Sequence, residues 1–142
     1  MSKVAVVFWS GTGNTAQMAS SVANGAKSAG ADVSVFNVSD GSFGAAKMDG
    51  FDAIAFGCPS MGAEVLEESE MQPLFDECKG KLGGKKIALF GSYGWGDGEW
   101  MRNWEAECKA AGAAMACDFV ICCEAPDAQA LDECAALGKA LA

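Results

Sequence analysis

The sequence has 142 residues, and its 19 acidic against 10 basic side chains leave a formal net charge of -9. A chain of this length buries about two thirds of its surface on folding, so we expect one domain spanning residues 1–142. The negative charge argues against nucleic acid as a ligand and favours a partner protein with a basic face. The first apolar run, residues 4–8, is far shorter than the ~20 residues of a membrane span, so no membrane is expected and the predicted location is cytoplasmic.

The cysteine and histidine content narrows the chemistry. There are seven cysteines, no C-x-x-C pair and no histidine. This composition argues against a zinc or iron–sulfur site, so no metal is expected. Most of the cysteines fall in apolar segments, which favours buried free thiols in a reducing compartment. Without histidine the chain also lacks the commonest general base, and most triad hydrolases are excluded.

Apolar runs alternate with helical patterns along the chain. In chain order the expected elements are strand 4–8, helix 15–29, strand 33–38, a glycine-rich connection 39–50, strand 51–57, helix 70–81, strand 86–91, helix 99–111, strand 117–123 and helix 127–141. Asp127 is the candidate cap of the last helix. Trp100 and Trp104, four residues apart, are expected in the core, with a place on the partner-binding face as the alternative. Five strands alternating with helices predict an α/β protein whose parallel sheet is covered on both faces.

The segment Ser10-Gly11-Thr12-Gly13-Asn14-Thr15 joins the first strand to the first helix. Its glycines let backbone N–H groups approach an anion, the helix start adds a partial positive charge, and the side chains add neutral donors. The segment contains no Lys or Arg, so it suits a phosphate held by neutral groups. Gly11-x-Gly13-x-x-Ala16 also fits the dinucleotide fingerprint, but the first acid after the second strand, Asp40, comes two residues late. A phosphate monoester is therefore favoured, with a dinucleotide or a plain capping turn as the alternatives.

Two further loops follow the third and fourth strands and must lie at the same edge of a parallel sheet. In the later loop Trp95 stands between two glycines and has little local packing, so a flat ligand would suit it. In the earlier loop Met61 precedes a glycine and can form an apolar wall opposite. A phosphate loop, an aromatic side chain and a thioether at one edge together predict a pocket for flavin mononucleotide (FMN).

From Lys3 to its end the chain closely resembles the short-chain flavodoxins. The resemblance is carried by Phe8-Trp9-Ser10-Gly11-Thr12-Gly13-Asn14-Thr15, Gly57-Cys58-Pro59-Ser60-Met61-Gly62, Leu66-Glu67-Glu68-Ser69 and Leu89-Phe90-Gly91-Ser92-Tyr93-Gly94-Trp95-Gly96-Asp97-Gly98. It implies a flavodoxin-like three-layer sandwich with a five-stranded sheet of order 2-1-3-4-5. The last strand lacks the inserted segment of the long-chain relatives.

The resemblance implies a low-potential one-electron carrier rather than an enzyme. Such a protein holds FMN non-covalently, cycles between semiquinone and hydroquinone, and passes electrons between reductases and oxidoreductases with basic faces. We expect it to be a monomer. Acidic residues crowd the same sheet edge and would disfavour a further negative charge on the flavin: Glu64, Glu67, Glu68, Glu70, Asp97, Glu99, Glu124 and Asp127.

The same resemblance assigns roles to the three loops. The phosphate would be held by Ser10, Thr12, Asn14 and Thr15 with the amides of Gly11 and Gly13. Trp95 would stack on the outer flavin face and Met61 on the inner one, while Glu64 would accept a hydrogen bond from the flavin imide. The remaining residues expected to line the cofactor are Ser60, Gly62, Ala63, Ser92, Tyr93, Gly94 and Gly96.

Two positions depart from the family pattern. Pro59 stands where some relatives carry a hydroxyl near the phosphate, and Ala63 occupies a turn position that favours Gly, Asn or Asp. Two other classes remain as alternatives. A flavin-dependent NAD(P)H:quinone reductase would need a nicotinamide pocket for which the chain has few extra residues. A signalling receiver module would need an Asp after the third strand, where Cys58 and Pro59 stand.

Overall fold

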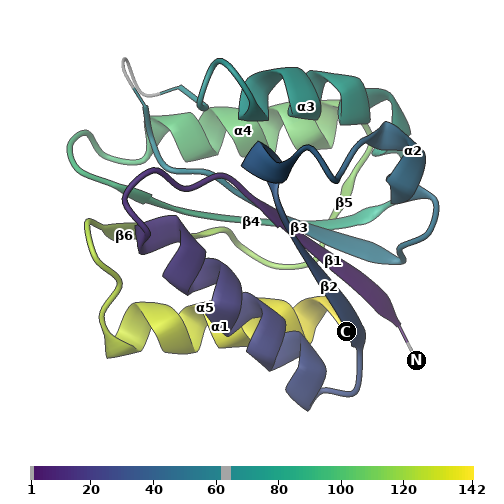
Figure 1. The fold of residues 1–142 in the computed structure, drawn as a ribbon, viewed down its shortest axis with the longest axis horizontal. Coiled ribbons are helices and arrows are strands. Elements are labelled where there is room, and N and C mark those ends of the chain that lie inside the picture. Colours follow the sequence, from purple (N-terminus) through teal and green to yellow (C-terminus); the bar gives the residue numbers. More distant parts are fainter. Residues whose placement is uncertain (1, 62–64) are drawn as a thin grey trace.

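The computed structural model describes residues 2–61 and 65–142, and its architecture is a parallel sheet between two layers of helices (Figure 1). The strands are β1 (Lys3–Phe8), β2 (Asp32–Asn37), β3 (Ala53–Gly57), β4 (Lys86–Tyr93), β5 (Ala114–Met115) and β6 (Val120–Cys123). The helices are α1 (Asn14–Ser28), α2 (Ala45–Met48), α3 (Met71–Cys78), α4 (Glu99–Ala110) and α5 (Ala128–Leu141), with short 3₁₀ turns η1 (Val38–Asp40) and η2 (Lys79–Lys81). Across the described residues no helix combines the length and apolar character that crossing a bilayer requires.

The strand order is β2-β1-β3-β4-β5, and every strand pairing in the sheet is parallel. This confirms the predicted fold class and strand order. Each predicted helix of ten or more residues is present within a few residues of its expected bounds, although α3 gives way to η2 after Cys78. The side-chain oxygen of Asp127 accepts a hydrogen bond from the amide of Ala130 at 2.8 Å, which confirms the cap of α5.

Alternation along the strands divides the core into two layers. Ala5 and Val7 face the side covered by α3 and α4, whereas Val4 and Val6 face the side covered by α1 and α5. The first layer holds the predicted core tryptophans, Trp100 and Trp104, and both are buried. A sheet covered on both faces can offer a binding site only at its edges or at the ends of its strands.

The fifth strand differs from the prediction. A single strand over 117–123 is wrong: β5 and β6 both pair with β4, and residues 116–119 between them are not in a strand. Met115 pairs with Ile87 and Val120 with Phe90, so the outer chain is two residues longer than its partner between these pairs. Two extra residues cannot stay in register with β4, so the edge strand bulges there.

The connection 39–50 also contains more structure than its sequence suggests. Residues 38–40 form η1 and residues 45–48 form α2, where a glycine-rich connection was expected. Phe43 and Met48 are buried, and the rings of Phe36 and Phe43 lie 5.0 Å apart. Tertiary packing of these apolar side chains, rather than local propensity, holds the segment in place.

Helices α1 and α5 pack closely because each carries a glycine at their contact. A Cβ atom added to Gly25 would overlap the carbonyl oxygen of Ala135, and one added to Gly138 would overlap that of Val22. Both obstacles are backbone atoms, which cannot move aside by a change of side-chain rotamer. The two glycines therefore fix how near α5 lies to α1, and α1 begins at the loop 10–15.

Replacing either of these glycines by alanine should destabilise the protein, contrary to the usual effect of this change within a helix. Overpacking of this kind costs about 1–3 kcal/mol, so Gly25→Ala and Gly138→Ala should each lower the free energy of unfolding by that amount in urea titrations. Gly80→Ala is the matched control, because a Cβ atom there meets nothing within 4 Å. Equal stability of all three variants would contradict the close packing.

Candidate functional site

A cavity of about 290 Å³ opens at the carboxyl ends of the parallel strands. Its walls come from the segments that follow β1, β3, β4 and β6. The lining residues are Trp9, Gly11, Thr12, Asn14, Pro59, Ser60, Met61, Ser92, Tyr93, Gly94 and Glu124. The structure thus brings together eight of the predicted site residues: Gly11, Thr12, Asn14, Ser60, Met61, Ser92, Tyr93 and Gly94.

The loop between β1 and α1 is closed by its own hydrogen bonds. The hydroxyl oxygen of Ser10 accepts from the amide of Gly13 at 3.1 Å and from that of Ala16 at 3.3 Å. Gly13 has φ of 96°, a left-handed conformation that a side chain would strain. Since the Ser10 oxygen is an acceptor in both bonds, its proton is available to a ligand. Ser10 and Gly13 thus stabilise the loop and do not line the cavity, unlike Gly11, Thr12 and Asn14.

Thr15 and Ser92 join this loop to the end of β4. Both side chains are buried, and their hydroxyl oxygens lie 3.3 Å apart. Ser92 also accepts a hydrogen bond at its carbonyl oxygen from the amide of Ser60, at 3.0 Å. The start of α1, the end of β4 and the loop after β3 are therefore joined by side-chain and backbone contacts beside the cavity.

The other walls of the cavity are largely apolar. Met61 and Tyr93 line it, and the ring of Tyr93 packs against that of Trp100 with centroids 5.6 Å apart. The loop around Met61 is closed by two backbone hydrogen bonds between Met61 and Val65, at 2.9 and 3.0 Å. Gly62, Ala63 and Glu64, which the sequence predicts to contact the cofactor, lie outside the described residues.

Trp95 and Gly96 do not line the cavity in this structure. Trp95 is 57% exposed, the largest exposed fraction among the large apolar side chains described. Gly96 and Gly98 both have positive φ, 86° and 95°, so the segment that carries Trp95 turns sharply on either side of Asp97. The predicted stacking side chain is therefore at the correct edge but turned to solvent.

Three lining residues were not predicted as site residues. Trp9 follows β1 directly, and its indole N–H donates to Glu70 at 2.9 Å, which holds the ring against the cavity. A Cβ atom at Gly11 would lie 3.1 Å from that ring, so a glycine there lets Trp9 approach. Pro59 and Glu124 are the other two, and Glu124 has φ of 58°, the one positive value among the described non-glycine residues. Backbone strain of this kind, often found at binding sites, cannot be read from a sequence.

Glu67 is buried beneath the rim instead of contributing an exposed acid. One of its carboxylate oxygens accepts from the amides of Glu70 at 2.6 Å and Met71 at 3.0 Å, and the other accepts from the amide and hydroxyl of Ser69. Burial by itself raises the pKa of Glu67, but these hydrogen bonds outweigh it and hold the pKa below its usual value. The carboxylate therefore acts as the cap of α3, whose start is next to the cavity loop.

Cys58, at the end of β3, is chemically inert. Its thiol is fully buried, donates to the carbonyl of Pro59 at 3.4 Å and accepts from the amide of Glu67 at 3.4 Å. Burial raises the pKa of this thiol to about 12, so it stays protonated at neutral pH. All seven cysteines are free thiols, as predicted.

The residues present fit FMN on the chemistry of their donors. The lining offers the neutral hydroxyl and amide groups of Thr12, Asn14, Ser60 and Ser92, and no Lys or Arg is among the described residues that line the cavity. Thioether and aromatic groups line the same cavity, as a flat ring system requires. In addition, the hydroxyl oxygen of Ser60 is buried without a hydrogen-bond partner, which leaves one unsatisfied polar group at the cavity wall.

The fold and site together define a doubly wound α/β protein with a cavity at the carboxyl edge of its sheet, where proteins of this class bind nucleotides. The sequence profile of the flavodoxin family matches residues 6–138, and the chain belongs to this family. It is 44% identical to a flavodoxin of Clostridium beijerinckii over 96% of this chain and 97% of that one, and 43% identical to one of Megasphaera elsdenii over 98% of both. The solution structure of the two-electron reduced Megasphaera elsdenii flavodoxin superposes with a TM-score of 0.89 over 97% of both chains.

Flavodoxins bind FMN and carry electrons, so this chain is an FMN-binding electron-transfer protein and not an enzyme. Cycling between the one- and two-electron-reduced flavin is the family's known role, in agreement with the prediction, and that role implies redox partner proteins. Because the chain belongs to the flavodoxin family, the two alternatives, a flavin-dependent quinone reductase and a signalling receiver module, are set aside.

Replacing the carboxylate of Glu67 by an uncharged amide should destabilise the folded protein, and the loss of stability should depend on pH. The pKa of Glu67 is lower in the folded state than in the unfolded chain, so its full contribution to stability is present above the ordinary Glu pKa of about 4.3. That contribution is lost as the pH falls through the pKa of the folded state. Glu67→Gln should therefore lower the free energy of unfolding by about 1 kcal/mol at pH 7, as the loss of a helix cap does. The difference in unfolding free energy between the variant and wild type should shrink as the pH falls below about 4.3.

Glu68→Gln provides the control, since Glu68 is the exposed neighbour of Glu67. Chemical unfolding of both variants between pH 3 and pH 8 makes the comparison. A Glu67→Gln variant that lost no more stability at pH 7 than Glu68→Gln would show that the capping carboxylate contributes little.

Proposed function

We propose that the cavity at the carboxyl edge holds FMN, with the phosphate at loop 10–15 and the flavin ring towards Met61 and Trp95. The observation that carries this proposal is the meeting of three loops in one cavity whose lining combines neutral hydroxyl and amide groups with apolar side chains. Ser10, Thr12, Asn14 and Thr15 would serve the phosphate with the start of α1. FMN, when bound, supplies the one-electron chemistry, and the protein orients it and limits the access of water.

Trp95 is the side chain best placed to cover the outer face of the ring. Its exposure leaves a large aromatic surface without a partner, and the glycines at 94 and 96 allow its segment to adjust. Met61 lines the cavity on the opposite loop and supplies the inner contact. Ser92, Tyr93 and Gly94 form the wall between them. The predicted roles of Gly62, Ala63 and Glu64 remain part of this proposal.

We further propose a monomeric, single-domain protein over residues 1–142 that works in the cytoplasm. One continuous sheet with a core layer on each face supports the single domain. Seven free thiols support a reducing compartment, because two of them, Cys122 and Cys123, are adjacent and Cys123 is exposed.

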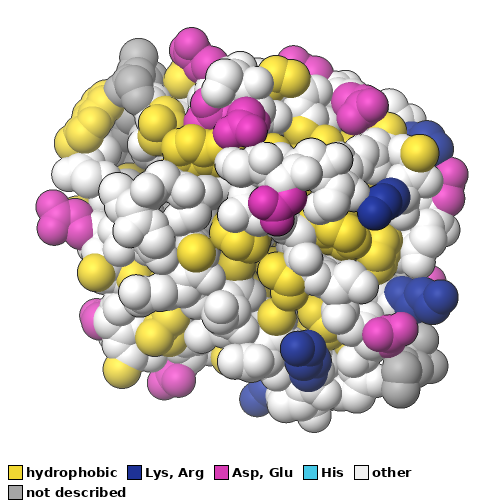
Figure 2. All heavy atoms as spheres, viewed as in Figure 1, with side chains coloured by type: hydrophobic (Ala, Val, Ile, Leu, Met, Phe, Trp, Pro, Cys, Tyr) yellow, Lys and Arg dark blue, Asp and Glu magenta, His cyan; other side chains and the backbone are white. Residues whose placement is uncertain are grey.

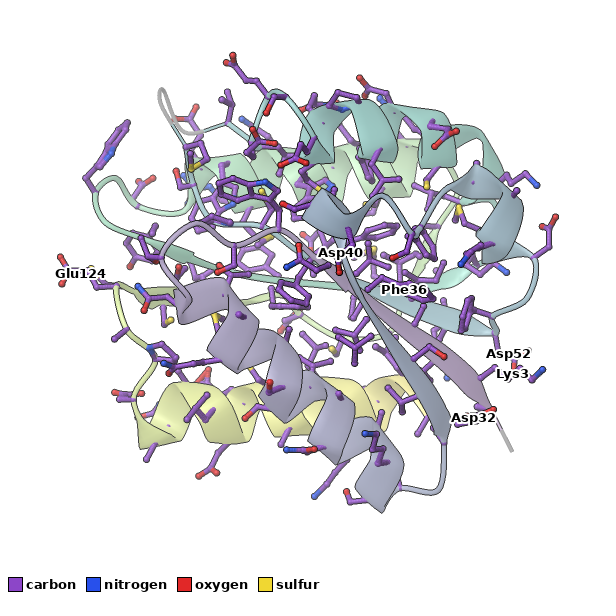
Figure 3. The ribbon with its side chains drawn as sticks, in the orientation of Figure 1. Lys3, Asp32, Phe36, Asp40, Asp52 and Glu124 are labelled. Carbon is purple, nitrogen blue, oxygen red and sulfur yellow. The ribbon has the colours of Figure 1, made fainter. Side chains whose placement is uncertain are left out.

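We propose that the partner proteins dock at the sheet edge that carries the cavity. Each partner would contact this edge through a basic face of its own. In Figure 2 the left side, where the strands end, shows acidic and apolar side chains and no Lys or Arg. Figure 3 places Glu124 at that end, whereas Asp32 and Asp52 lie at the opposite end of the sheet. Val65 and Trp95 supply exposed apolar surface near the loops of this edge. Acidic groups around an apolar centre favour fast, salt-sensitive docking of a basic partner.

Titration of the cofactor-free protein with FMN tests the proposed site, with flavin fluorescence as the readout. The wild type should bind one FMN per chain, and Trp95→Ala should weaken binding by about tenfold, or ~1.4 kcal/mol, through lost stacking. Val35→Ala is the control, since Val35 is 48% exposed on β2 at the outer edge of the sheet. A wild-type protein that failed to bind FMN would overturn the proposal.

The docking edge is tested by removing one charge at each end of the molecule. At low salt Glu124→Gln should slow electron transfer from a reductase with a basic face by about twofold, the effect of one charge at ~10 Å in water. Asp32→Asn removes the same charge at the far end and should change the rate little. Stopped-flow rates at several salt concentrations give the comparison, and the difference should vanish at high salt. Equal slowing by both variants would show that net charge matters and this edge does not.

A further inference from the structure

We propose that the hydroxyl of Ser60 binds the ribityl-phosphate tail of FMN and so contributes to selection of FMN over flavins without that tail. The inference rests on the proposed function, because it concerns the same cavity. It concerns a side chain that differs from its neighbours in one respect: it lines the cavity, yet its polar atom has no partner in the protein.

The unpaired hydroxyl is unusual in this molecule. Among the described residues, buried side-chain nitrogen or oxygen atoms without a partner occur at Ser60 and Trp104. Trp104 projects from α4 into the core and does not line this cavity. A buried hydroxyl without a hydrogen bond is unfavourable, so such groups persist mainly where a ligand or water satisfies them. For Ser60 the adjoining cavity is where that partner can be found.

The backbone of Ser60 is fixed, which leaves its side chain one degree of freedom. Its amide donates to the carbonyl of Ser92 at 3.0 Å, and the preceding residue is Pro59. Rotation about the Cα–Cβ bond is therefore the movement by which the hydroxyl can turn from its buried position towards the cavity that the residue lines. This movement displaces no backbone atom, so a ligand can recruit the hydroxyl at little energetic cost.

The tail of the cofactor, rather than the ring, is the expected partner. Through Ser92, whose hydroxyl lies 3.3 Å from that of Thr15, the Ser60 backbone is linked to the first turn of α1. That turn follows the loop with the anion-binding character. The apolar contacts that a ring requires come instead from Met61 and Tyr93. Pro59 has neither a hydroxyl nor an amide proton, so Ser60 is the hydroxyl that the β3 loop offers there.

The test compares Ser60→Ala with wild type for three ligands: FMN, riboflavin and lumiflavin, which carries no ribityl tail. Cofactor-free protein is titrated with each, and its melting temperature is measured without ligand. Ser60→Ala should weaken FMN binding by about tenfold and leave lumiflavin binding unchanged. Its melting temperature without ligand should be unchanged or higher by about 2 °C, because an unpaired buried hydroxyl has been removed. Ser20→Ala, on the exposed face of α1, is the matched control.

The titration with riboflavin, which has the ribityl chain but no phosphate, shows which part of the tail the Ser60 hydroxyl contacts. An undiminished affinity for riboflavin would place the hydroxyl on the phosphate, and a loss equal to that for FMN would place it on the ribityl chain; both support the proposal. Unchanged FMN binding, or equal weakening of FMN and lumiflavin, would overturn it. Failure of the proposed function is distinct, because the wild-type protein itself would then not bind FMN.

Discussion

The site depends on a constraint of parallel sheets: all strands point the same way, so the loops that follow them meet at one edge. Here the start of α1, the loop after β3 and the end of β4 meet through two contacts, the amide of Ser60 on the carbonyl of Ser92 and the hydroxyl pair of Ser92 and Thr15. Neither contact is large in energy. Their importance is positional, since each joins loops that are far apart in sequence and lets neutral donors from separate strands act on one ligand.

The absence of Lys and Arg from the lining residues gives this arrangement its electrostatic character. A phosphate held by a helix start and hydroxyl groups keeps most of its negative charge, because nothing cationic compensates it. Together with the acidic groups of the rim, such as Glu124, that charge disfavours adding a further negative charge to the flavin. Glu67 contributes less to this field than its sequence position suggests, because its carboxylate is bound to the start of α3.

Much of the fold was predictable because the strands are short apolar runs between strong helix patterns, and the site loops carry unusual residues at spacings the sheet brings together. The failures have physical causes. The edge strand breaks between β5 and β6 because it holds two residues more than β4 can pair, a matter of register that no single sequence displays. Residues 45–48 are held in place by the burial of Met48 and the neighbouring Phe43 in the core, which local propensity does not display. At the site, Met61 and loop 10–15 were predictable from residue type, whereas the unpaired Ser60 hydroxyl and the left-handed Glu124 depend on the folded structure.

The central claim is that one cofactor is held jointly by three loops at a single edge of the sheet. Amide hydrogen exchange with and without FMN tests it most directly, since binding slows exchange where the backbone is ordered or covered. The account predicts slower exchange at residues 11–15, 60–61 and 92–95 together. Residues 29–31 and 83–85, which precede β2 and β4 at the opposite end, should be unaffected. Protection confined to one loop, or spread equally over both ends of the sheet, would contradict it.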